Sequence, residues 1–147
     1  MKILMLCMGN ICRSPLAEGI LRSKIAKHHE VDSAGTISMH EGKKADHRSI
    51  TTGLQHGIDI NSHRARPLCK EDFEIFDKIY CMDVDNFENA SSLAKNDEQR
   101  QKLSLILDVM SSETQEVPDP YWGTMEDFEK VYQMLNKACE IIAKELN

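Results

Sequence analysis

Short apolar runs and stretches of helical periodicity alternate along this chain of 147 residues. Four apolar runs have the length of buried β-strands, and they cover residues 3–6, 30–34, 78–82 and 103–107. Between and after these runs, apolar residues recur at the spacing of amphipathic helices. The predicted helices cover residues 14–28, 46–56, 71–76, 84–95 and a long stretch from 124 through at least 142.

Local signals mark where several of these helices begin and end. Ser14 is expected to be the N-cap of the first helix, with Pro15 at the first helical position, where its missing N–H costs nothing. Gly57 is expected to end the second helix. Residues 124–127 resemble a capping box that opens the last helix. The polar stretch 36–44 is typical of a surface loop.

Alternation of short strands with helices predicts an α/β fold. Parallel strands need long crossover connections, so this order indicates a parallel sheet with helices on both faces. Crossovers are right-handed and ligands bind at the carboxyl ends of the strands. The loop after the first strand is therefore expected to lie at the functional edge of the sheet. We find no repeat, low-complexity tract or linker, and we expect one domain over residues 1–147.

Composition narrows the class of protein. Hydrophobic residues make up 41% and charged residues 29% of the chain, which is typical of a globular protein. The formal net charge of −6 argues against nucleic acid as a partner. Five cysteines, an odd number, indicate reduced thiols and a cytoplasmic protein. The apolar start is shorter than a secretory signal, and no segment is long enough for membrane insertion.

One loop carries most of the candidate chemistry. The segment Cys7-Met8-Gly9-Asn10-Ile11-Cys12-Arg13-Ser14-Pro15 follows the first apolar run and leads into the first helix. A loop in this position presents backbone N–H groups and the positive end of the helix dipole to an oxyanion such as phosphate. The same field is expected to lower the pKa of Cys7 well below the free value of about 8.5, giving a nucleophilic thiolate. A buried strand cysteine is the usual alternative, but Arg13 and the glycine-containing turn argue against it.

This loop, together with Asp119-Pro120-Tyr121-Trp122-Gly123, resembles the low-molecular-weight protein tyrosine phosphatase family. Three further segments follow in the order and approximate spacing of that family: Val31–Gly35, Ser62–Arg66 and Tyr80–Asp83. The resemblance implies a single-domain, Rossmann-like three-layer sandwich with a four-stranded parallel sheet in the order 2-1-3-4. It also implies hydrolysis of phosphotyrosine in proteins and of aryl phosphates, without a cofactor or a metal.

The resemblance assigns roles within the Cys7 loop. Cys7 takes the phosphoryl group, and Arg13 grips two of its oxygens through a planar fork. Ser14 can donate its hydroxyl to the Cys7 sulfur. The remaining charge is bound by backbone N–H groups along the loop, namely those of Met8, Gly9, Asn10, Ile11, Cys12, Arg13 and Ser14. Inorganic phosphate and vanadate are expected to occupy the same cradle.

Asp119 is the expected general acid. A tyrosine phenolate leaves poorly because the pKa of its conjugate acid is about 10. Asp119 would protonate this group in the first step and deprotonate the attacking water in the second. Pro118 and Pro120 flank it and stiffen its loop. On local sequence alone, Asp119 is more simply interpreted as a turn residue, because an Asp-Pro pair commonly starts a turn. The presence of the Cys7 loop elsewhere in the chain favours the general acid instead.

Two sets of residues are expected to support the site. Asn10 should adopt a left-handed conformation that turns the N–H groups of the loop inward, and the resemblance gives it Ser33, Ser14 and His63 as side-chain partners. His63 is therefore interpreted as a brace and not as a base. The remaining histidines are expected at the surface or at helix ends, without a role; they are His28, His29, His40, His47 and His56.

A cleft for the substrate ring is expected beside the general acid. Tyr121 and Trp122 should line a deep cleft that holds a flat phenyl ring and selects phosphotyrosine over the shorter phosphoserine. Many relatives carry an aromatic residue on the opposite wall, where this chain has Met39. This departure leaves one face of the cleft flexible.

Cys12 lies five positions after Cys7, and two sister activities and one non-catalytic function use a similar loop. The resemblance suggests a reversible Cys7–Cys12 disulfide under peroxide, whereas the spacing of the two thiols disfavours zinc. Arginine-phosphate phosphatases of the family tend to have Thr in place of Ile11. Arsenate reductases need further thiols on a mobile segment, and Cys81 lies within a predicted strand. A non-catalytic phosphate-binding module or redox sensor would not need Asp119. These alternatives stay open at the level of sequence.

Overall fold

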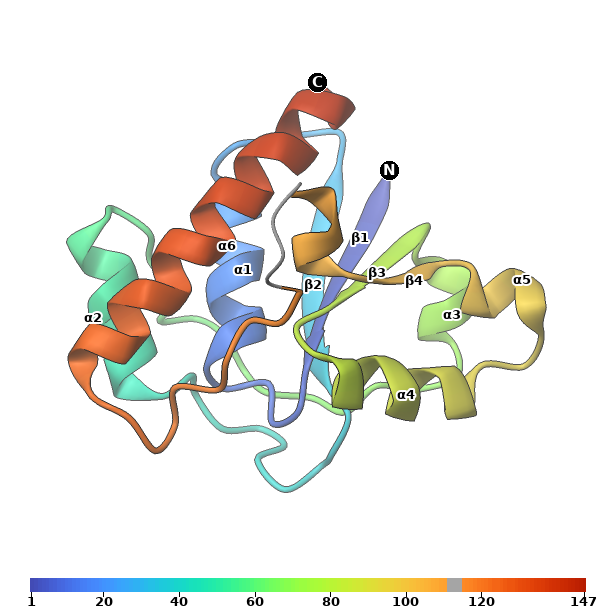
Figure 1. Ribbon diagram of the computed structural model, residues 1–147, viewed down its shortest axis with the longest axis horizontal. Helices are drawn as coiled ribbons and strands as arrows, with labels where there is room; N and C mark the ends of the chain where they lie inside the picture. The colour runs from blue at the N-terminus through green and yellow to red at the C-terminus, as the bar shows by residue number, and fades with distance from the viewer. Residues whose placement is uncertain (111–114) are drawn as a thin grey trace.

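The computed structural model describes residues 1–110 and 115–147, and its centre is a four-stranded parallel sheet (Figure 1). The strands are β1 (Lys2–Cys7), β2 (Glu30–Gly35), β3 (Lys78–Cys81) and β4 (Leu103–Leu105). They lie in the order β2-β1-β3-β4, and every neighbouring pair is parallel. The predicted fold class and strand order are therefore confirmed.

Helices cover both faces of this sheet (Figure 1). One layer contains α1 (Arg13–Arg22), α2 (His47–Gln55) and the long C-terminal α6 (Met125–Leu146). The other contains α3 (Asp72–Ile75) and α4 (Val84–Leu93), while the short α5 (Asp97–Arg100) precedes β4 in the chain.

The central strand β1 shows why its sequence is a continuous apolar run. Successive side chains of a strand point to opposite faces, and a strand buried on both faces needs apolar residues throughout. Ile3 and Met5 join the apolar cluster beneath α1 and α6. Leu4 and Leu6 join a second cluster beneath α3 and α4. All four side chains are fully buried.

The parallel arrangement brings the ends of several strands to one edge. Cys7, the last residue of β1, pairs with Gly35 at the end of β2. Leu6 pairs with Cys81, the last residue of β3. The segments that follow these three strands therefore start side by side, and this edge carries the candidate site.

The first helix differs from its prediction at both ends. It ends at Arg22 and not near residue 28, because the chain turns there: Ser23 Oγ donates to the Ile20 carbonyl at 2.6 Å. Ile25, which supplied the last repeat of the helical pattern, packs against the core from this turn. The prediction of Ser14 as N-cap is also wrong. Cys12 holds that position, and Pro15 is the third helical residue.

The other elements follow their predictions more closely. The last strand is shorter than expected, since a 3-10 helix, η1 (Ile106–Val109), replaces its final two residues. The short α5 was not predicted. Gly57 follows α2 with a φ of 78°, the left-handed conformation that favours glycine at a helix end. The predicted capping box is confirmed, because the Thr124 N–H donates to Asp127 Oδ2 at 2.8 Å.

Candidate active site

The loop between β1 and α1 forms the floor of a cleft with a volume of about 460 Å³. Ten of the lining residues are candidates from the sequence: Cys7, Met8, Gly9, Ile11, Cys12, Arg13, Met39, Asp119, Tyr121 and Trp122. The fold thus brings the two motif segments, more than a hundred residues apart in the sequence, to one cavity. Asn10 and Ser14, also predicted to bind phosphate, do not line this cleft and are fully buried behind it.

Asn10 sets the direction of the hydrogen bonds beneath the loop. Asn10 has a φ of 57°, so its predicted left-handed conformation is confirmed. Its Nδ2 donates to Ser14 Oγ at 2.8 Å and to Ser33 Oγ at 3.0 Å. Ser14 Oγ lies 2.9 Å from Cys7 Sγ. Because the Ser14 oxygen already accepts a hydrogen bond from Asn10 Nδ2, its own hydroxyl hydrogen is free to point at the sulfur.

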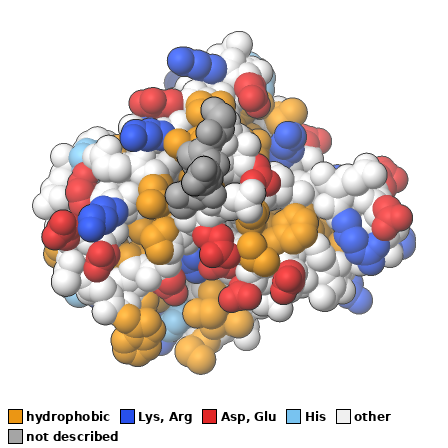
Figure 2. Space-filling view, in the orientation of Figure 1, with side chains coloured by type: hydrophobic (Ala, Val, Ile, Leu, Met, Phe, Trp, Pro, Cys, Tyr) orange, Lys and Arg blue, Asp and Glu red, His pale blue; other side chains and the backbone are white. Residues whose placement is uncertain are grey.

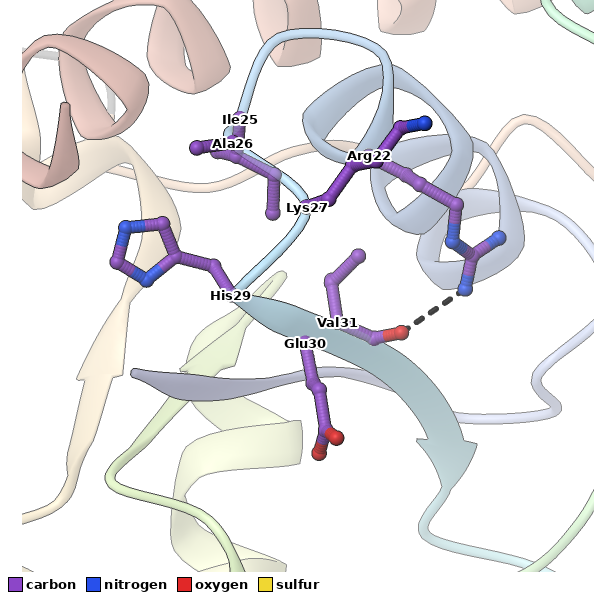
Figure 3. A pocket seen from close by; sticks show the side chains of 7 residues that line it. All are labelled: Arg22, Ile25, Ala26, Lys27, His29, Glu30 and Val31. Carbon is purple, nitrogen blue, oxygen red and sulfur yellow. Dashed lines mark hydrogen bonds between the residues drawn. The ribbon is translucent and has the colours of Figure 1, made fainter.

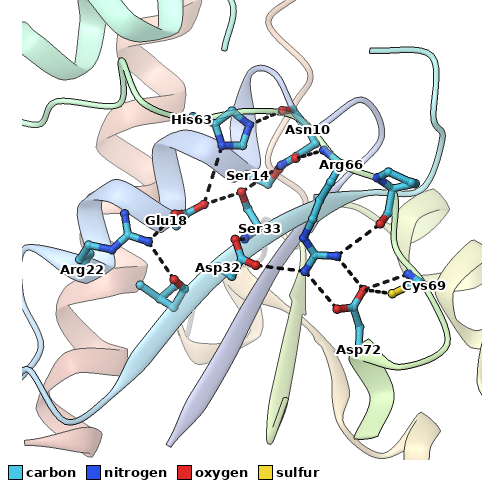
Figure 4. A network of polar contacts seen from close by, with 12 residues as sticks. Asn10, Ser14, Glu18, Arg22, Asp32, Ser33, His63, Arg66, Cys69 and Asp72 are labelled. Carbon is cyan, nitrogen blue, oxygen red and sulfur yellow. Dashed lines mark hydrogen bonds and ion pairs between the residues drawn. The ribbon is translucent and has the colours of Figure 1, made fainter. Parts of the chain in front are cut away.

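A second layer of polar groups continues this network (Figure 4). Ser33 Oγ donates to Glu18 Oε1 at 2.6 Å, and Glu18 Oε2 accepts from Arg22. His63 Nε2 lies 2.8 Å from the Asn10 carbonyl oxygen, which can only accept, so this nitrogen carries the proton. His63 thus contacts the backbone of Asn10 and not its side chain. Glu18, in α1, was not predicted to belong to the site. The sequence offered one signal for it, the i,i+4 spacing to Arg22.

The Arg66 guanidinium forms the other half of this network (Figure 4). It donates to both oxygens of Asp72, each at 3.0 Å, and to Asp32 Oδ2 at 3.1 Å. The backbone N–H of Arg66 donates to Asn10 Oδ1 at 3.0 Å. The segment after α2 is thereby fastened to the loop and to the end of the sheet.

Arg13 is held in place by groups that its local sequence does not reveal. Its side chain is buried, and Nη1 donates to Asp83 Oδ2 at 2.6 Å and to the Val117 carbonyl at 2.9 Å. Burial works against the charge, but the Cys7 sulfur and then Asp83 outweigh it and raise the pKa of Arg13. Asp83 follows β3, and the parallel sheet explains why it reaches Arg13. This positioning by Asp83 was not predicted.

Asp119 lies at the mouth of the cleft, close to Arg13. Its Oδ2 is 3.9 Å from Arg13 Nη2, and Oδ1 accepts from the Tyr121 N–H at 3.1 Å. The side chain keeps about a third of its surface exposed. A carboxyl group so placed faces both the cleft and solvent.

The walls of the cleft are more apolar and more exposed than its floor. Trp122 is 91% exposed and Met39 is 74% exposed, while the Tyr121 ring meets the Trp122 ring edge-on at 5.0 Å. Two further lining residues were missed in the sequence, Ile37 and His40. His40, assigned to the surface without a role, lies over Gly9: a Cβ there would stand 3.0 Å from its ring. The spacing of the loop gave no signal for this contact.

The cysteines fall into distinct environments. Cys12 is buried beside Cys7, and burial, with smaller effects of Asp46 and Cys7, raises the pKa of its thiol. Cys81 and Cys139 are also buried, and chiefly for this reason the pKa of each thiol is raised to about 12. Cys69 is exposed, and all five thiols are free.

A second cavity, of about 350 Å³, opens where β2 begins, away from the Cys7 loop (Figure 3). Arg22 borders it and donates to the Val31 carbonyl at 2.9 Å. No cysteine or serine lines it. In the described part of the chain, no three or more His, Cys, Asp or Glu side chains are grouped to hold a metal ion. Nor do residues 1–110 and 115–147 include a helix with the length and apolar character needed to cross a membrane.

In the space-filling view, apolar side chains gather near acidic ones in the centre and lower part of the face shown (Figure 2). The residues that account for exposed apolar surface at the cleft are Met8, Met39, Tyr121 and Trp122. The buried charge of Arg13 thus lies within a largely apolar rim.

Comparisons with known proteins agree with this geometry. The model of the family "Low molecular weight phosphotyrosine protein phosphatase" matches residues 2–147. The chain is 38% identical to low molecular weight phosphotyrosine protein phosphatase 1 of Drosophila melanogaster, over 98% of this chain and 96% of that protein. It is 36% identical to the human low molecular weight phosphotyrosine protein phosphatase, over 93% and 90% of the two chains.

Similarity to solved structures agrees with the similarity in sequence. A protein tyrosine phosphatase from Entamoeba histolytica with Hepes in its active site superposes with a TM-score of 0.93, at 38% identity, over 99% of this chain and 96% of that chain. Wzb from Vibrio vulnificus, in complex with benzylphosphonate, superposes with a TM-score of 0.89, at 31% identity, over 99% and 98%. The chain belongs to the low molecular weight phosphotyrosine protein phosphatase family.

Proposed function

We propose that this protein hydrolyses phosphotyrosine in proteins, and aryl phosphates, through a cysteinyl-phosphate intermediate. The observation that carries the proposal is the convergence of three groups on one cleft. Cys7 and Arg13 line its floor, and Asp119 lies at its mouth, 3.9 Å from the Arg13 guanidinium. A site that only binds phosphate has no use for a carboxyl group at that point, because a carboxylate repels the anion.

In the first step, the Cys7 thiolate attacks phosphorus and the bond from phosphorus to the phenolic oxygen breaks. Asp119 donates a proton to that oxygen, and such a role contributes about 10²–10⁴-fold in rate. Arg13 and the N–H groups of the loop hold the oxygens of the transferred group. The fixed partners of Arg13, Asp83 and the Val117 carbonyl, support a guanidinium that is oriented before substrate arrives.

In the second step, the Asp119 carboxylate takes a proton from water as that water attacks phosphorus. The bond from phosphorus to sulfur breaks, and Cys7 leaves as a thiolate that the Ser14 hydroxyl stabilises. Phosphate is released, and Asp119 is again protonated for the next cycle. Each proton and electron pair is thus returned within the cycle.

The lining of the cleft supports the proposed substrate class. Its walls include Tyr121, Trp122 and Met39, and its floor carries the Arg13 charge, which suits an aryl phosphate. A relay of thiols, as arsenate reduction needs, is not supported by Cys81, since it is buried within β3.

The odd number of cysteines and the free thiols support a cytoplasmic protein.

Purified protein should release phosphate from para-nitrophenyl phosphate and from a phosphotyrosine peptide in the presence of a chelator, and vanadate should inhibit it. Cys7→Ser should abolish turnover, whereas Cys69→Ser, which changes an exposed thiol outside the cleft, should not. Phosphoarginine and arsenate are assayed beside these substrates. Turnover that survives Cys7→Ser, or a preference for phosphoarginine or arsenate, would refute the proposal.

A further inference from the structure

Arg48 connects two segments of the active site that are far apart in the sequence. It lies in the first turn of α2, outside the lining of the cleft, and its side chain is about a quarter exposed. Its guanidinium contacts an acidic partner on one side and the segment that carries Asp119 on the other. No motif singled out this residue.

The first contact ties Arg48 to the Cys7 loop. Asp46 accepts from Arg48 Nε at 3.0 Å and from Nη2 at 2.9 Å, a two-point pairing that fixes the plane of the guanidinium. Asp46 is also the N-cap of α2, and its own N–H donates to the Ile11 carbonyl at 2.8 Å. Ile11 is part of the floor of the cleft. The position of Arg48 is therefore set relative to that floor.

The second contact ties Arg48 to the segment of the general acid. Nη2 donates to the Tyr121 carbonyl at 3.0 Å. The guanidinium also lies over the Tyr121 ring at 5.5 Å and over the ring of Phe128, a fully buried residue of α6, at 4.6 Å. Stacking on a buried ring limits the movement of the arginine.

Asp119 lies between two anchored points of its segment. On the N-terminal side, the Val117 N–H donates to the Met82 carbonyl at 2.8 Å. On the C-terminal side, the Tyr121 N–H donates to Asp119 Oδ1, and the Tyr121 carbonyl accepts from Arg48. The anchor nearest to the carboxyl group on that side thus depends on Arg48.

We propose that Arg48 is a positioning residue for proton transfer: it holds the Tyr121 carbonyl, and through it the Asp119 carboxyl group, at a fixed place above the Cys7 loop. The inference rests on the proposed function, because it requires Asp119 to be the general acid. A displacement of about 1 Å at a reacting group can cost about 10²-fold in rate. Loss of Arg48 should therefore weaken acid catalysis even though Arg48 does not line the cleft.

The experiment compares two leaving groups on each enzyme variant. Phenyl phosphate needs a proton donor because the pKa of its leaving group is about 10, as for tyrosine. Dinitrophenyl phosphate has a leaving group of much lower pKa and needs little help. The variants are Arg48→Met, Arg48→Lys and, as a matched control, Arg100→Met. Arg100 is also a surface arginine paired with a nearby carboxylate, Asp97, at 2.9 Å.

Arg48→Met should lower kcat/KM for phenyl phosphate by about tenfold or more, within the range that a general acid contributes. For dinitrophenyl phosphate kcat/KM should change little. Arg48→Lys should lie between wild type and Arg48→Met, because it keeps the charge and loses the planar fork. Arg100→Met should match wild type with both substrates.

The ratio of the two kcat/KM values is measured on one sample, so a partly unfolded variant gives the same ratio as a folded one. An equal loss with both substrates, or no loss, would overturn the inference. In an Asp119→Ala background, Arg48→Met should have no further effect on that ratio, and a further effect would show that Arg48 acts elsewhere. If wild type hydrolyses neither substrate, the proposed function fails. If Asp119→Ala alters the ratio and Arg48→Met does not, only this inference fails.

Discussion

Substitution of Ser14 by alanine tests the hydrogen bond to Cys7, the proposed nucleophile. The Ser14 hydroxyl is fully buried and lies 2.9 Å from Cys7 Sγ. Its oxygen accepts from Asn10, so its proton has the sulfur as its acceptor. The bond should strengthen wherever negative charge builds up on sulfur, and in the proposed mechanism this occurs as the thiolate leaves in the second step.

The size of the effect follows from the charge on the acceptor. A hydrogen bond to a charged group contributes about 1.5–3 kcal/mol. Since 1.36 kcal/mol is about a factor of ten in rate, kcat of Ser14→Ala should fall about 10- to 150-fold. Asn10 keeps Ser33 as an acceptor, and the N–H groups of the loop are unchanged. Inhibition by inorganic phosphate should therefore change much less than kcat.

The assay is the steady-state and burst kinetics of para-nitrophenyl phosphate hydrolysis. Slower breakdown of the intermediate should leave a larger burst of nitrophenol relative to the steady rate. Ser49→Ala is the control, because Ser49 is also buried and donates to the Cys12 carbonyl at 3.1 Å, not to the sulfur. Equal losses of kcat in the two variants, or a loss of phosphate binding that matches the loss of kcat, would refute this reasoning.

Three further predictions concern charge and redox state. Asp83→Asn removes the carboxylate that orients Arg13, so inhibition by phosphate should weaken about tenfold, measured as the inhibition constant. In Cys12→Ser, inactivation by peroxide should no longer be reversed by dithiothreitol, because the Cys7 sulfur loses its neighbouring thiol. Burial opposes ionisation of Asp46, but hydrogen bonds from Arg48 outweigh it and lower the pKa of Asp46. The ionised Asp46 carboxylate therefore stabilises the folded state above its unfolded pKa of about 3.9, and this stabilisation is lost as pH falls below that value. The free energies of unfolding of wild type and Asp46→Asn, measured by urea titration, should therefore converge at acid pH.

The fold was largely predictable because its strands are short, apolar and separated by helices. The errors occur where local pattern and tertiary contact disagree. Ile25 continues the helical repeat, yet the Ser23 hydroxyl bonds back to the helix end and the chain turns before it. At the other edge of the sheet, Ile106 and Leu107 are apolar because they are buried, and burial occurs in a 3-10 helix as well as in a strand.

The site was predictable where its residues are adjacent in the sequence and less so where the fold brings them together. The loop from Cys7 to Arg13 is contiguous, so its spacing carried the signal. Glu18, Asp83 and Arg48 reach the site from three different elements, and each looks like an ordinary charged residue on a helix or after a strand. The packing of α1 against β2, the register of the parallel sheet and the packing of α2 on α6 give these charges their partners.

Asn10 shows how the fold prepares the loop before any substrate is bound. Its side chain is fully buried, and every polar group on it has a partner: Nδ2 donates to Ser14 and Ser33, and Oδ1 accepts from the Arg66 N–H. Its carbonyl accepts from His63. A buried amide with all of its hydrogen bonds made resists rotation, because any other orientation leaves a polar group without a partner. The energy that holds the loop rigid is thus released during folding, and in the proposed reaction the N–H groups of the loop need no reorganisation when charge develops on the transferred phosphoryl group.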